Sequence, residues 1–391
     1  GIMLMGFLLT GAQEEYPAYV LGFGTVAICQ WALFLFYAMI RRSSFEVETI
    51  AFFLCTLGIA AIATVKPGEV LKQSAAMVLG VMMFLLIGWS LRDLERAKRF
   101  RYLAVLAGVG FLVITLVFGT EYYGAKNWLM IGSLSLQPSE LSKVCFVYAG
   151  ASTMDRIMNK RNLILFIAYS VVICGLLALM NDFGTALIFF CAFLIIAYLR
   201  SGSVGTIALA CTALGFAGVL ALRIAPHALN RFASWRHIWE NPFTSGYQQT
   251  QAIMCIASGG LFGLGPGKGF LQKVFAADSD IVFATISEEW GLLLALMAVL
   301  AVVALGLFAI RTSRVSRSSF YCIGGCTAAG ILLIQASLNC LGTVDILPFT
   351  GVTFPFISNG GTSMIGAWGL LAFVKAADTR QNASFAVRFS K

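Results

Sequence analysis

The chain has 391 residues, of which 59% are hydrophobic and 12% are charged, and its formal net charge is +9. A mean hydropathy of +0.86 is far above the values of soluble domains, so the composition excludes a soluble globular fold and indicates a polytopic membrane protein. Since the chain has only two histidines, we expect neither a histidine-based metal site nor a Ser-His-Asp triad. The ten cysteines lie mostly in apolar segments and show no metal-ligand spacing.

Apolar runs long enough to cross a bilayer recur along the chain. We expect membrane-spanning helices near residues 18–40, 46–65, 71–91, 102–119, 162–180, 184–199, 203–222, 291–310, 319–342 and 361–377, and a more polar one near 139–155. Residues 1–12 have the composition of half of one further span. Because the sequence begins without an initiator methionine, we expect that residues precede it.

Basic residues gather on one side of the expected membrane. Counting spans places 18 of the 27 lysines and arginines in loops on the same side. This asymmetry is the positive-inside pattern of cytoplasmic loops. The net charge therefore reflects topology, and we expect no nucleic-acid partner. By the same count, the loops at 120–138, 181–183, 223–290 and 343–360 face outward.

The first outward loop contains Lys126 and leads into a helix that begins at Pro138. Proline suits the first turn of a helix, and Glu140 in that turn suits the helix dipole. Glu140 and Lys143 are three residues apart, so we expect them to share one helix face and to pair within the membrane. Two interpretations stay open: a self-neutralising pair that orients two helices, or a pair that lines a polar cavity reached by a substrate headgroup.

Other polar residues lie at the outer ends of later spans. Asp182 sits between two spans, where it can cap the following helix or support a site in an outward cavity. Gln335 and Asn339 are four residues apart on one span, and both need hydrogen-bond partners in a lipid environment. Ser358 and Ser363 belong to a polar turn, Ser-Asn-Gly-Gly-Thr-Ser, where a helix begins at the outer face.

The longest polar stretch, residues 223–290, is rich in glycine and carries five of the 18 acidic residues. A membrane protein has few carboxylates, so the presence of several in one loop is most simply explained by binding or chemistry there. Glycines at 259–269 allow tight turns that expose N–H groups to phosphate or sugar, and Lys268 beside them would favour an anionic headgroup. In the alternative interpretation, Asp278 and Asp280 are solvated loop acids. Glu288 and Glu289 precede a span, and we interpret one as a helix cap and the other as a cavity residue.

Several motifs occur in a fixed order. They are Gln-Pro-Ser-Glu-Leu-Ser-Lys at 137–143, Asp-Phe-Gly-Thr-Ala at 182–186, Gly-Tyr-Gln at 246–248, Ser-Gly-Gly-Leu-Phe-Gly at 258–263, Ser-Asp-Ile-Val-Phe-Ala at 279–284 with Glu-Glu-Trp-Gly at 288–291, and Pro-Phe-Ile-Ser-Asn-Gly-Gly-Thr-Ser at 355–363. This string resembles the SEDS family of bacterial shape, elongation, division and sporulation proteins, of the RodA, FtsW and SpoVE type. The resemblance covers about residues 46–377.

The resemblance implies an all-α polytopic membrane fold with a ten-helix core over 46–377 and a large extracytoplasmic loop between core helices 7 and 8, at about 223–290. Residues 1–45 would form one or two extra transmembrane segments, and 378–391 a cytoplasmic tail. Three positions depart from the family pattern. Asn127 stands where the family has arginine, Asn181 where it has proline, and Asn359 where it has tyrosine. The chain therefore resembles a divergent member of the SEDS family.

The resemblance also implies a function: a peptidoglycan glycosyltransferase that polymerises lipid II at the outer face of the cytoplasmic membrane, in elongation, division or sporulation. Asp280 falls on the essential aspartate of the family. Glycosyl transfer needs a base near the acceptor hydroxyl and charge compensation for the leaving pyrophosphate. Asp280 could accept the proton, or hold a divalent cation, Mg²⁺ or Mn²⁺, against the pyrophosphate. No organic cofactor is expected.

Fourteen other residues are expected to bind substrate or support the site. They are Lys126, Glu140, Lys143, Asp182, Arg231, Gln248, Ser258, Gly259, Lys268, Glu289, Gln335, Asn339, Ser358 and Ser363. The family typically works with a class B penicillin-binding protein, so we expect such a transpeptidase as partner. The alternative function is a flippase or transporter for a lipid-linked precursor, which would place its essential charges at mid-membrane. A polymerase would place them in an outward cavity.

Overall fold

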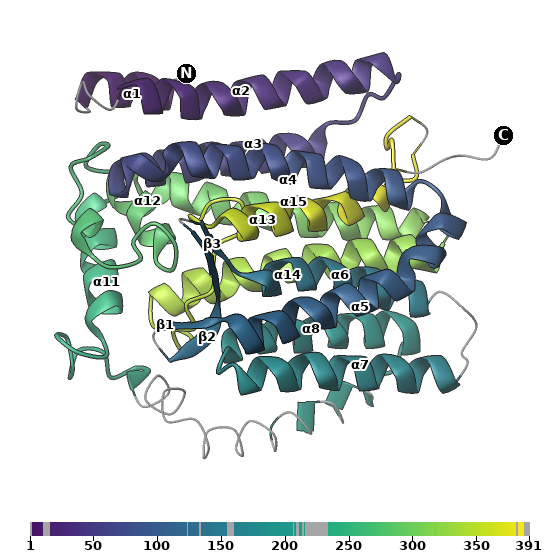
Figure 1. The fold of residues 1–391 in the computed structure, drawn as a ribbon. Helices are drawn as coiled ribbons and strands as arrows, with labels where there is room; N and C mark the ends of the chain where they lie inside the picture. The colour runs from purple at the N-terminus through teal and green to yellow at the C-terminus, as the bar shows by residue number, and fades with distance from the viewer. Residues whose placement is uncertain are drawn as a thin grey trace.

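The computed structural model describes residues 2–10, 16–122, 124–132, 134–154, 160–205, 207–208, 211–212, 215, 234–316, 318–380 and 382–386. Long helices lie side by side in a bundle, and a small sheet and several short helices gather at one end (Figure 1). We call this end, which holds residues 120–122, 124–132, 134–136, 180–182, 246–291 and 343–360, the loop end. The expected all-α polytopic fold is confirmed.

The long helices alternate in direction along the bundle, as spans of a polytopic protein do. In chain order the helices are α1 (Ile2–Thr10), α2 (Tyr16–Met39), α3 (Glu46–Val65), η2 (Pro67–Glu69), α4 (Val70–Leu91), α5 (Leu94–Phe118), α6 (Pro138–Met154), α7 (Lys160–Leu179), α8 (Phe183–Ser201), α11 (Tyr247–Gly259), η3 (Leu271–Lys273), α12 (Val282–Trp290), α13 (Leu292–Val315), α14 (Ser319–Thr343) and α15 (Gly361–Ala376).

Eight helices of the described residues are long and apolar enough to cross a membrane, namely α2, α3, α4 with η2, α5, α7, α8, α13 and α14. Each matches an expected span. The shorter α6 and α15 also form where helices were expected, whereas the expected span at 203–222 lies largely outside the described residues. Apolar side chains on the outer face stay exposed, with Leu106 at 71% and Leu300 at 64%, because this face meets lipid.

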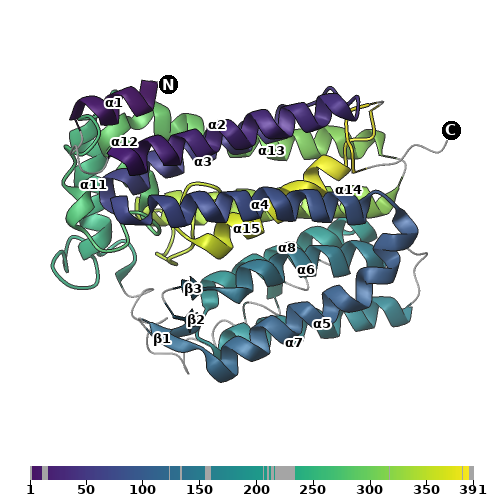
Figure 2. The same ribbon diagram turned by 45° about the horizontal axis from the view of Figure 1, so that its top comes forward.

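The core is centred on α15, which packs between α3, α4, α6 and α14 (Figure 2). Trp368 of α15 is fully buried among the rings of Phe52, Phe84 and Phe356. Gly80 of α4 makes this packing possible, because a Cβ at that position would lie 2.6 Å from the Trp368 indole. The helix that follows the 343–360 connection is thus rigidly anchored, and so is that connection.

The first outward loop differs from expectation, because it folds into a three-stranded antiparallel sheet of β1 (Thr120–Tyr122), β2 (Ala125–Ile131) and β3 (Leu134–Leu136). Gly124 and Gly132, with φ of +81° and +61°, lie at the two turns, where a side chain would be strained. At the same end α11 runs across the bundle while the spans lie along it (Figures 1 and 2).

The extra N-terminal helices pack on the core at both ends. Gly22 lets α2 approach α4, since a Cβ there would lie 2.6 Å from Val70 Cγ1. Near the opposite end, Tyr37 of α2 donates a hydrogen bond to Glu48 of α3. Glu48 in turn pairs with Lys375 of α15 at 3.0 Å, and both side chains are fully buried. Lys375, in the last turn of α15 and within the expected span 361–377, is therefore a buried core residue at the end of the bundle opposite the loop end.

The expected C-terminal tail is also partly packed. Asp378, Ala383 and Phe385 are buried, and the Phe385 ring fills the space above Gly88 of α4, where a Cβ would lie 2.6 Å from it. Asp378 binds the Arg380 guanidinium at 2.8 Å, and Arg380 also binds Glu46 of α3 at 2.6 Å. Described residues just beyond α15 therefore belong to the packed bundle.

Candidate active site at the loop end

Asp280 lies in a tight turn immediately before α12. The turn begins at Ala276, which adopts a φ of +56° that is unusual for a residue with a side chain. The Ala276 carbonyl accepts hydrogen bonds from the N–H groups of Ser279 and Asp280, at 3.1 and 3.0 Å. The backbone on the amide side of Asp280 is therefore held within its own turn.

The Asp280 carboxylate is half-buried and faces Gly351 in the connection between α14 and α15. A Cβ on Gly351 would lie 3.2 Å from Asp280 Oδ2, and Gly351 has a φ of +66°. Both observations require glycine at this position, because a side chain would press on the carboxylate and strain the backbone. The candidate catalytic acid thus lies between α12 and the connection that contains Gly351.

Asp278, two residues away, has a different environment and is almost fully buried. Lys66 Nζ lies 3.0 and 3.1 Å from its two carboxylate oxygens, and Asn359 Nδ2 donates to Oδ2 at 2.7 Å. The carboxylate of Asp278 is saturated with donors, which suits a structural role in joining α3, the 276–281 turn and the segment before α15. No sequence pattern pointed to Lys66 as the partner of Asp278, because the two residues are 212 positions apart.

Asn339, Ser358 and Ser363, which the sequence singled out, lie beside this turn. Asn339 Nδ2 donates to the carbonyls of Asp280 and Val352, at 2.9 and 2.8 Å. Ser358 Oγ donates to the Ser279 carbonyl at 2.7 Å. Ser363 Oγ instead shares a hydrogen bond with Thr353 Oγ1 at 2.8 Å.

Gln335 and Arg231 are placed differently. Gln335 is buried on α14, one helical turn before Asn339. Arg231 lies outside the described residues, so its expected contact with substrate stays a prediction.

Glu140 and Lys143 form the expected pair on one face of α6. Lys143 Nζ lies 2.7 Å from Glu140 Oε2, and both side chains are buried. Gly366 of α15 allows the close approach of the two helices, because a Cβ there would lie 2.9 Å from the Glu140 carbonyl oxygen. The pairing is confirmed, whereas a role of the pair toward substrate stays a prediction.

Asp182 caps α8, as one of the two interpretations held. Its Oδ1 accepts a hydrogen bond from the Thr185 N–H at 3.1 Å. Its Oδ2 accepts from Asn127 Nδ2, also at 3.1 Å, and this contact joins α8 to β2. The Lys126 N–H donates to the Met180 carbonyl at 2.9 Å. These bonds tie the sheet to the ends of α7 and α8.

The two adjacent glutamates of α12 differ in their surroundings, and the cap that Glu288 forms is on the preceding η3 instead of on the span that follows; a cavity role for Glu289 stays a prediction. Glu288 accepts hydrogen bonds from the N–H groups of Phe270 and Leu271, at 2.8 and 3.0 Å, and so caps η3. Glu289 is 2% exposed, and its Oε2 has no hydrogen-bond partner among the described residues. Burial, and secondarily the charge of Glu288, raise the pKa of Glu289 to about 8.

The glycine-rich run at 259–269 packs its backbone against α12. A Cβ on Gly259 would lie 2.4 Å from the Ser287 carbonyl oxygen, and one on Gly263 would lie 2.3 Å from that of Glu289. The N–H groups of Leu264 and Gly265 donate to the carbonyls of Glu288 and Glu289, at 2.9 and 3.0 Å. The N–H groups of Leu264 and Gly265 are therefore engaged within the protein, and Gly259 and Gly263 serve close packing against α12, whereas Gly260 and Gly267 border open space.

Three further expected site residues, Lys268, Ser258 and Gln248, also belong to the loop end. Lys268 and Ser258 are exposed, and Ser258 Oγ donates to the Cys255 carbonyl at 2.9 Å. Gln248 Nε2 donates to the Phe275 carbonyl at 2.9 Å. Lys268 is exposed to solvent, and its contact with an anionic headgroup stays a prediction, whereas Ser258 Oγ and Gln248 Nε2 contact protein.

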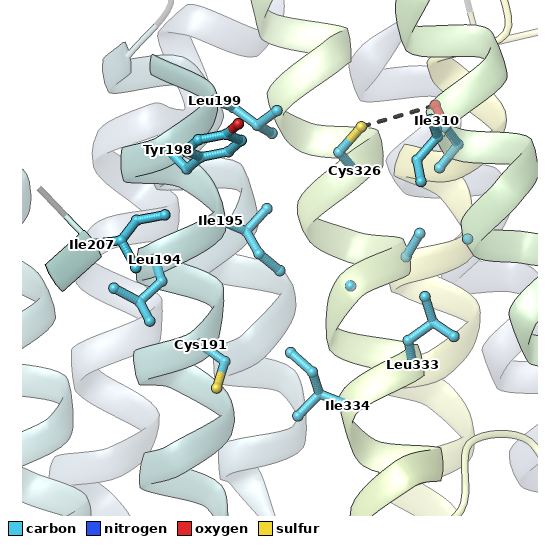
Figure 3. Close-up of a pocket in the computed structure, with 14 residues that line it drawn as sticks. Cys191, Leu194, Ile195, Tyr198, Leu199, Ile207, Ile310, Cys326, Leu333 and Ile334 are labelled. Atoms are coloured by element: carbon cyan, nitrogen blue, oxygen red, sulfur yellow. Dashed lines mark hydrogen bonds between the residues drawn. The ribbon is translucent and has the colours of Figure 1, made fainter. Parts of the chain in front are cut away.

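A separate apolar cavity of about 470 Å³ lies between α8, α13 and α14 (Figure 3). Its lining includes Ile195, Tyr198, Ile310 and Leu333. Ile195, Tyr198 and Ile310 lie in the halves of α8 and α13 that are remote from the loop end, and Leu333 lies near the middle of α14. Among the described residues, none that lines the cavity is charged, so this lining has none of the chemistry found around Asp280.

Comparison with known proteins places the chain among multi-pass membrane proteins of cell-wall synthesis. The family model for FtsW, RodA and SpoVE proteins, described as "Cell cycle protein", matches residues 52–383. The chain belongs to this family, and the resemblance drawn from its motifs is confirmed.

Individual relatives agree with this assignment. The chain is 30% identical over 326 residues to the "Peptidoglycan glycosyltransferase RodA" of Mycobacterium tuberculosis, which covers 78% of this chain and 69% of the relative. It is 29% identical over 340 residues to the "Probable peptidoglycan glycosyltransferase FtsW" of Escherichia coli, covering 79% of this chain and 81% of the relative.

Solved structures show the same fold. A chain of a peptidoglycan synthase complex aligns with a TM-score of 0.72 at 23% identity, covering 86% of this chain and 98% of the other. The rod shape determining protein RodA of Thermus thermophilus aligns with a TM-score of 0.62 at 24% identity and the same coverage.

Proposed function

We infer that this protein is a peptidoglycan glycosyltransferase that polymerises lipid II into glycan strands. Family membership and the relatives named as glycosyltransferases support the reaction class. The observation that carries the assignment to a site is Asp280, a half-buried acid in a turn held at the loop end. We propose that this end faces outward, because the basic loops lie at the other end.

In the transfer step, the hydroxyl oxygen of the acceptor sugar forms a bond to the anomeric carbon of the donor sugar. The bond from that carbon to the pyrophosphate oxygen breaks, and undecaprenyl pyrophosphate leaves. The hydroxyl proton needs an acceptor in this step. The Asp280 carboxylate can take that proton, since it is partly accessible and its position is set by the surrounding backbone.

Asp280 can also serve as a cation ligand. The described residues contain no group of three or more His, Cys, Asp or Glu side chains that could hold a metal ion. Mg²⁺ is commonly held by one or two carboxylates together with waters and phosphate oxygens. The donor set therefore fits a cation shared between Asp280 and the substrate pyrophosphate, where it would neutralise the charge of the leaving group.

The surroundings suit an anionic lipid headgroup. Lys66 keeps half of its side chain exposed while it contacts Asp278, and Lys268 is exposed on the same end. We propose that these ammonium groups attract the pyrophosphate. The Glu140–Lys143 pair is almost fully buried in the structure, and a contact of this pair with substrate stays a prediction.

We propose a class B penicillin-binding protein as partner, which would cross-link the strands that this chain makes. Support comes from a structural neighbour whose solved structure is described as a "peptidoglycan synthase complex" that coordinates polymerization and crosslinking.

The alternative, transport of a lipid-linked precursor, requires charged groups near mid-membrane that are reachable from both sides. In the described part of the spans, the buried acids are paired: Glu48 with Lys375 and Glu140 with Lys143. Asp280 belongs to one end of the bundle. This arrangement favours chemistry at one face.

The test is a polymerisation assay with purified protein, its partner transpeptidase and lipid II, read as glycan strands on a gel. We expect product from the wild type and none from Asp280→Ala. Glu240→Gln is the matched control, because Glu240 is an exposed acid of the same loop, paired with His237. Undiminished product from Asp280→Ala would contradict the catalytic assignment. Transport of labelled lipid II across liposomes without any polymer would favour the alternative.

A further inference from the structure

Three consecutive carbonyl groups around Asp280 are each held by a donor from elsewhere in the chain. The Asp278 carbonyl accepts from the Asn359 N–H at 2.8 Å. The Ser279 carbonyl accepts from Ser358 Oγ at 2.7 Å. The Asp280 carbonyl accepts from Asn339 Nδ2 at 2.9 Å. We call these three donors the carbonyl clamp.

The clamp fixes more than the local fold of the turn. The N–H groups of Ser279 and Asp280 already bond to the Ala276 carbonyl, so the peptide planes on both sides of the Asp280 Cα are held. With both planes fixed, the direction of the Cα–Cβ bond is fixed as well. Gly351 borders the space around the carboxylate, because a Cβ there would lie 3.2 Å from Asp280 Oδ2.

The donors themselves are rigid. Asn339 lies on α14 and Ser358 lies just before α15, and both side chains are buried. Asn339 also bonds the Val352 carbonyl at 2.8 Å, next to Gly351. Ser358 Oγ also accepts from the Phe354 N–H at 2.8 Å. One side chain on α14 therefore holds both the Asp280 backbone and the backbone that borders its carboxylate.

We propose that Asn339 and Ser358 are positioning residues, which act through the backbone of 279–280 to set where the Asp280 carboxylate meets the substrate. This inference rests on the proposed function. A displacement of a catalytic group by about 1 Å can lower a rate about 100-fold. Loss of the clamp should therefore lower turnover per folded molecule while substrate affinity changes little.

Three variants probe the clamp. Asn339→Leu keeps the size of the side chain and removes its donors. Ser358→Ala removes the hydroxyl, whereas Ser358→Thr retains it and serves as the conservative counterpart. Gly351→Ala leaves the donors in place and pushes on the carboxylate directly. Thr327→Val is the matched control, because Thr327 is buried on the same helix three turns from Asn339.

The measurements are kcat and KM with lipid II, the melting temperature, the pH–rate profile and the divalent-cation concentration for half-maximal rate. For Asn339→Leu, Ser358→Ala and Gly351→Ala we expect kcat to fall about 10- to 100-fold with KM within about twofold. We also expect a shift in the pH–rate profile or in the cation requirement, since both report on Asp280. Ser358→Thr should recover most of the rate, and Thr327→Val should match the wild type.

Each outcome decides between explanations. Loss of rate in proportion to loss of folded protein, with unchanged pH and cation profiles, would overturn the proposal in favour of a purely structural role. Rates within about twofold of wild type for Ser358→Ala and Gly351→Ala would overturn it as well. If Asn339→Leu does not fold, the comparison of Ser358→Ala with Ser358→Thr still decides. Activity of Asp280→Ala would instead refute the proposed catalytic role of Asp280. That result is distinguishable from a failure of the positioning proposal.

Discussion

Replacing Lys375 with methionine should destabilise the protein strongly, because it would strand a buried carboxylate. Lys375 Nζ lies 3.0 Å from Glu48 Oε1 and 2.7 Å from the Ser44 carbonyl, and neither Glu48 nor Lys375 has exposed side-chain surface. Tyr37 supplies the other hydrogen bond to Glu48. Removing one partner of a buried ion pair typically costs about 3–5 kcal/mol, so we expect a loss of that size for Lys375→Met.

The double variant Glu48→Leu/Lys375→Met separates the pair from its surroundings. Replacing both charges by apolar groups of similar volume is often neutral or even stabilising, so the double variant should recover most of the loss. The assay is a double-mutant cycle of unfolding free energies from denaturant titration in detergent micelles. A single variant within about 0.5 kcal/mol of the wild type, or a double variant as unstable as Lys375→Met, would refute this reasoning.

Two further perturbations test the packing of the loop end. The pKa of Glu289 is raised from 4.5 to about 8, so the folded state binds more protons than the unfolded state between these values and loses stability as pH rises through them. Glu289→Gln should therefore match the wild type near pH 4.5 and exceed its melting temperature near pH 9; a constant difference across this range would contradict the shift. Gly263→Ala should destabilise more than Gly267→Ala, because both positions have positive φ but only Gly263 lies against backbone. Strain alone costs about 1–2 kcal/mol, and equal melting temperatures for the two variants would refute the packing argument.

The sequence predicted those parts of the structure that depend on local pattern. Long apolar runs require helices in a bilayer, because backbone polar groups need internal partners. The spacing of Glu140 and Lys143 on one helix predicted their pairing, and the place of Asp182 before α8 predicted its cap. Local signals also existed for the missed sheet: Gly124 and Gly132 bound a β-prone segment, which is a hairpin pattern.

Contacts between residues far apart along the chain could not be predicted from the sequence. Lys66 and Asp278 are 212 residues apart, and Asn339 and Asp280 are 59 apart. No periodicity or composition links such positions. The glycine run at 259–269 shows the same limit, because whether its N–H groups face a ligand or α12 depends on tertiary packing alone.

The most direct test of the central claim compares the wild type with Asp280→Asn in lipid II polymerisation. Asp280→Asn keeps the size of the side chain but removes the carboxylate, which can otherwise accept a proton or bind a cation. We expect folded protein with an unchanged melting temperature and no glycan strands, while Glu240→Gln polymerises normally. Glycan strands from Asp280→Asn in the same amount as from the wild type would contradict the account.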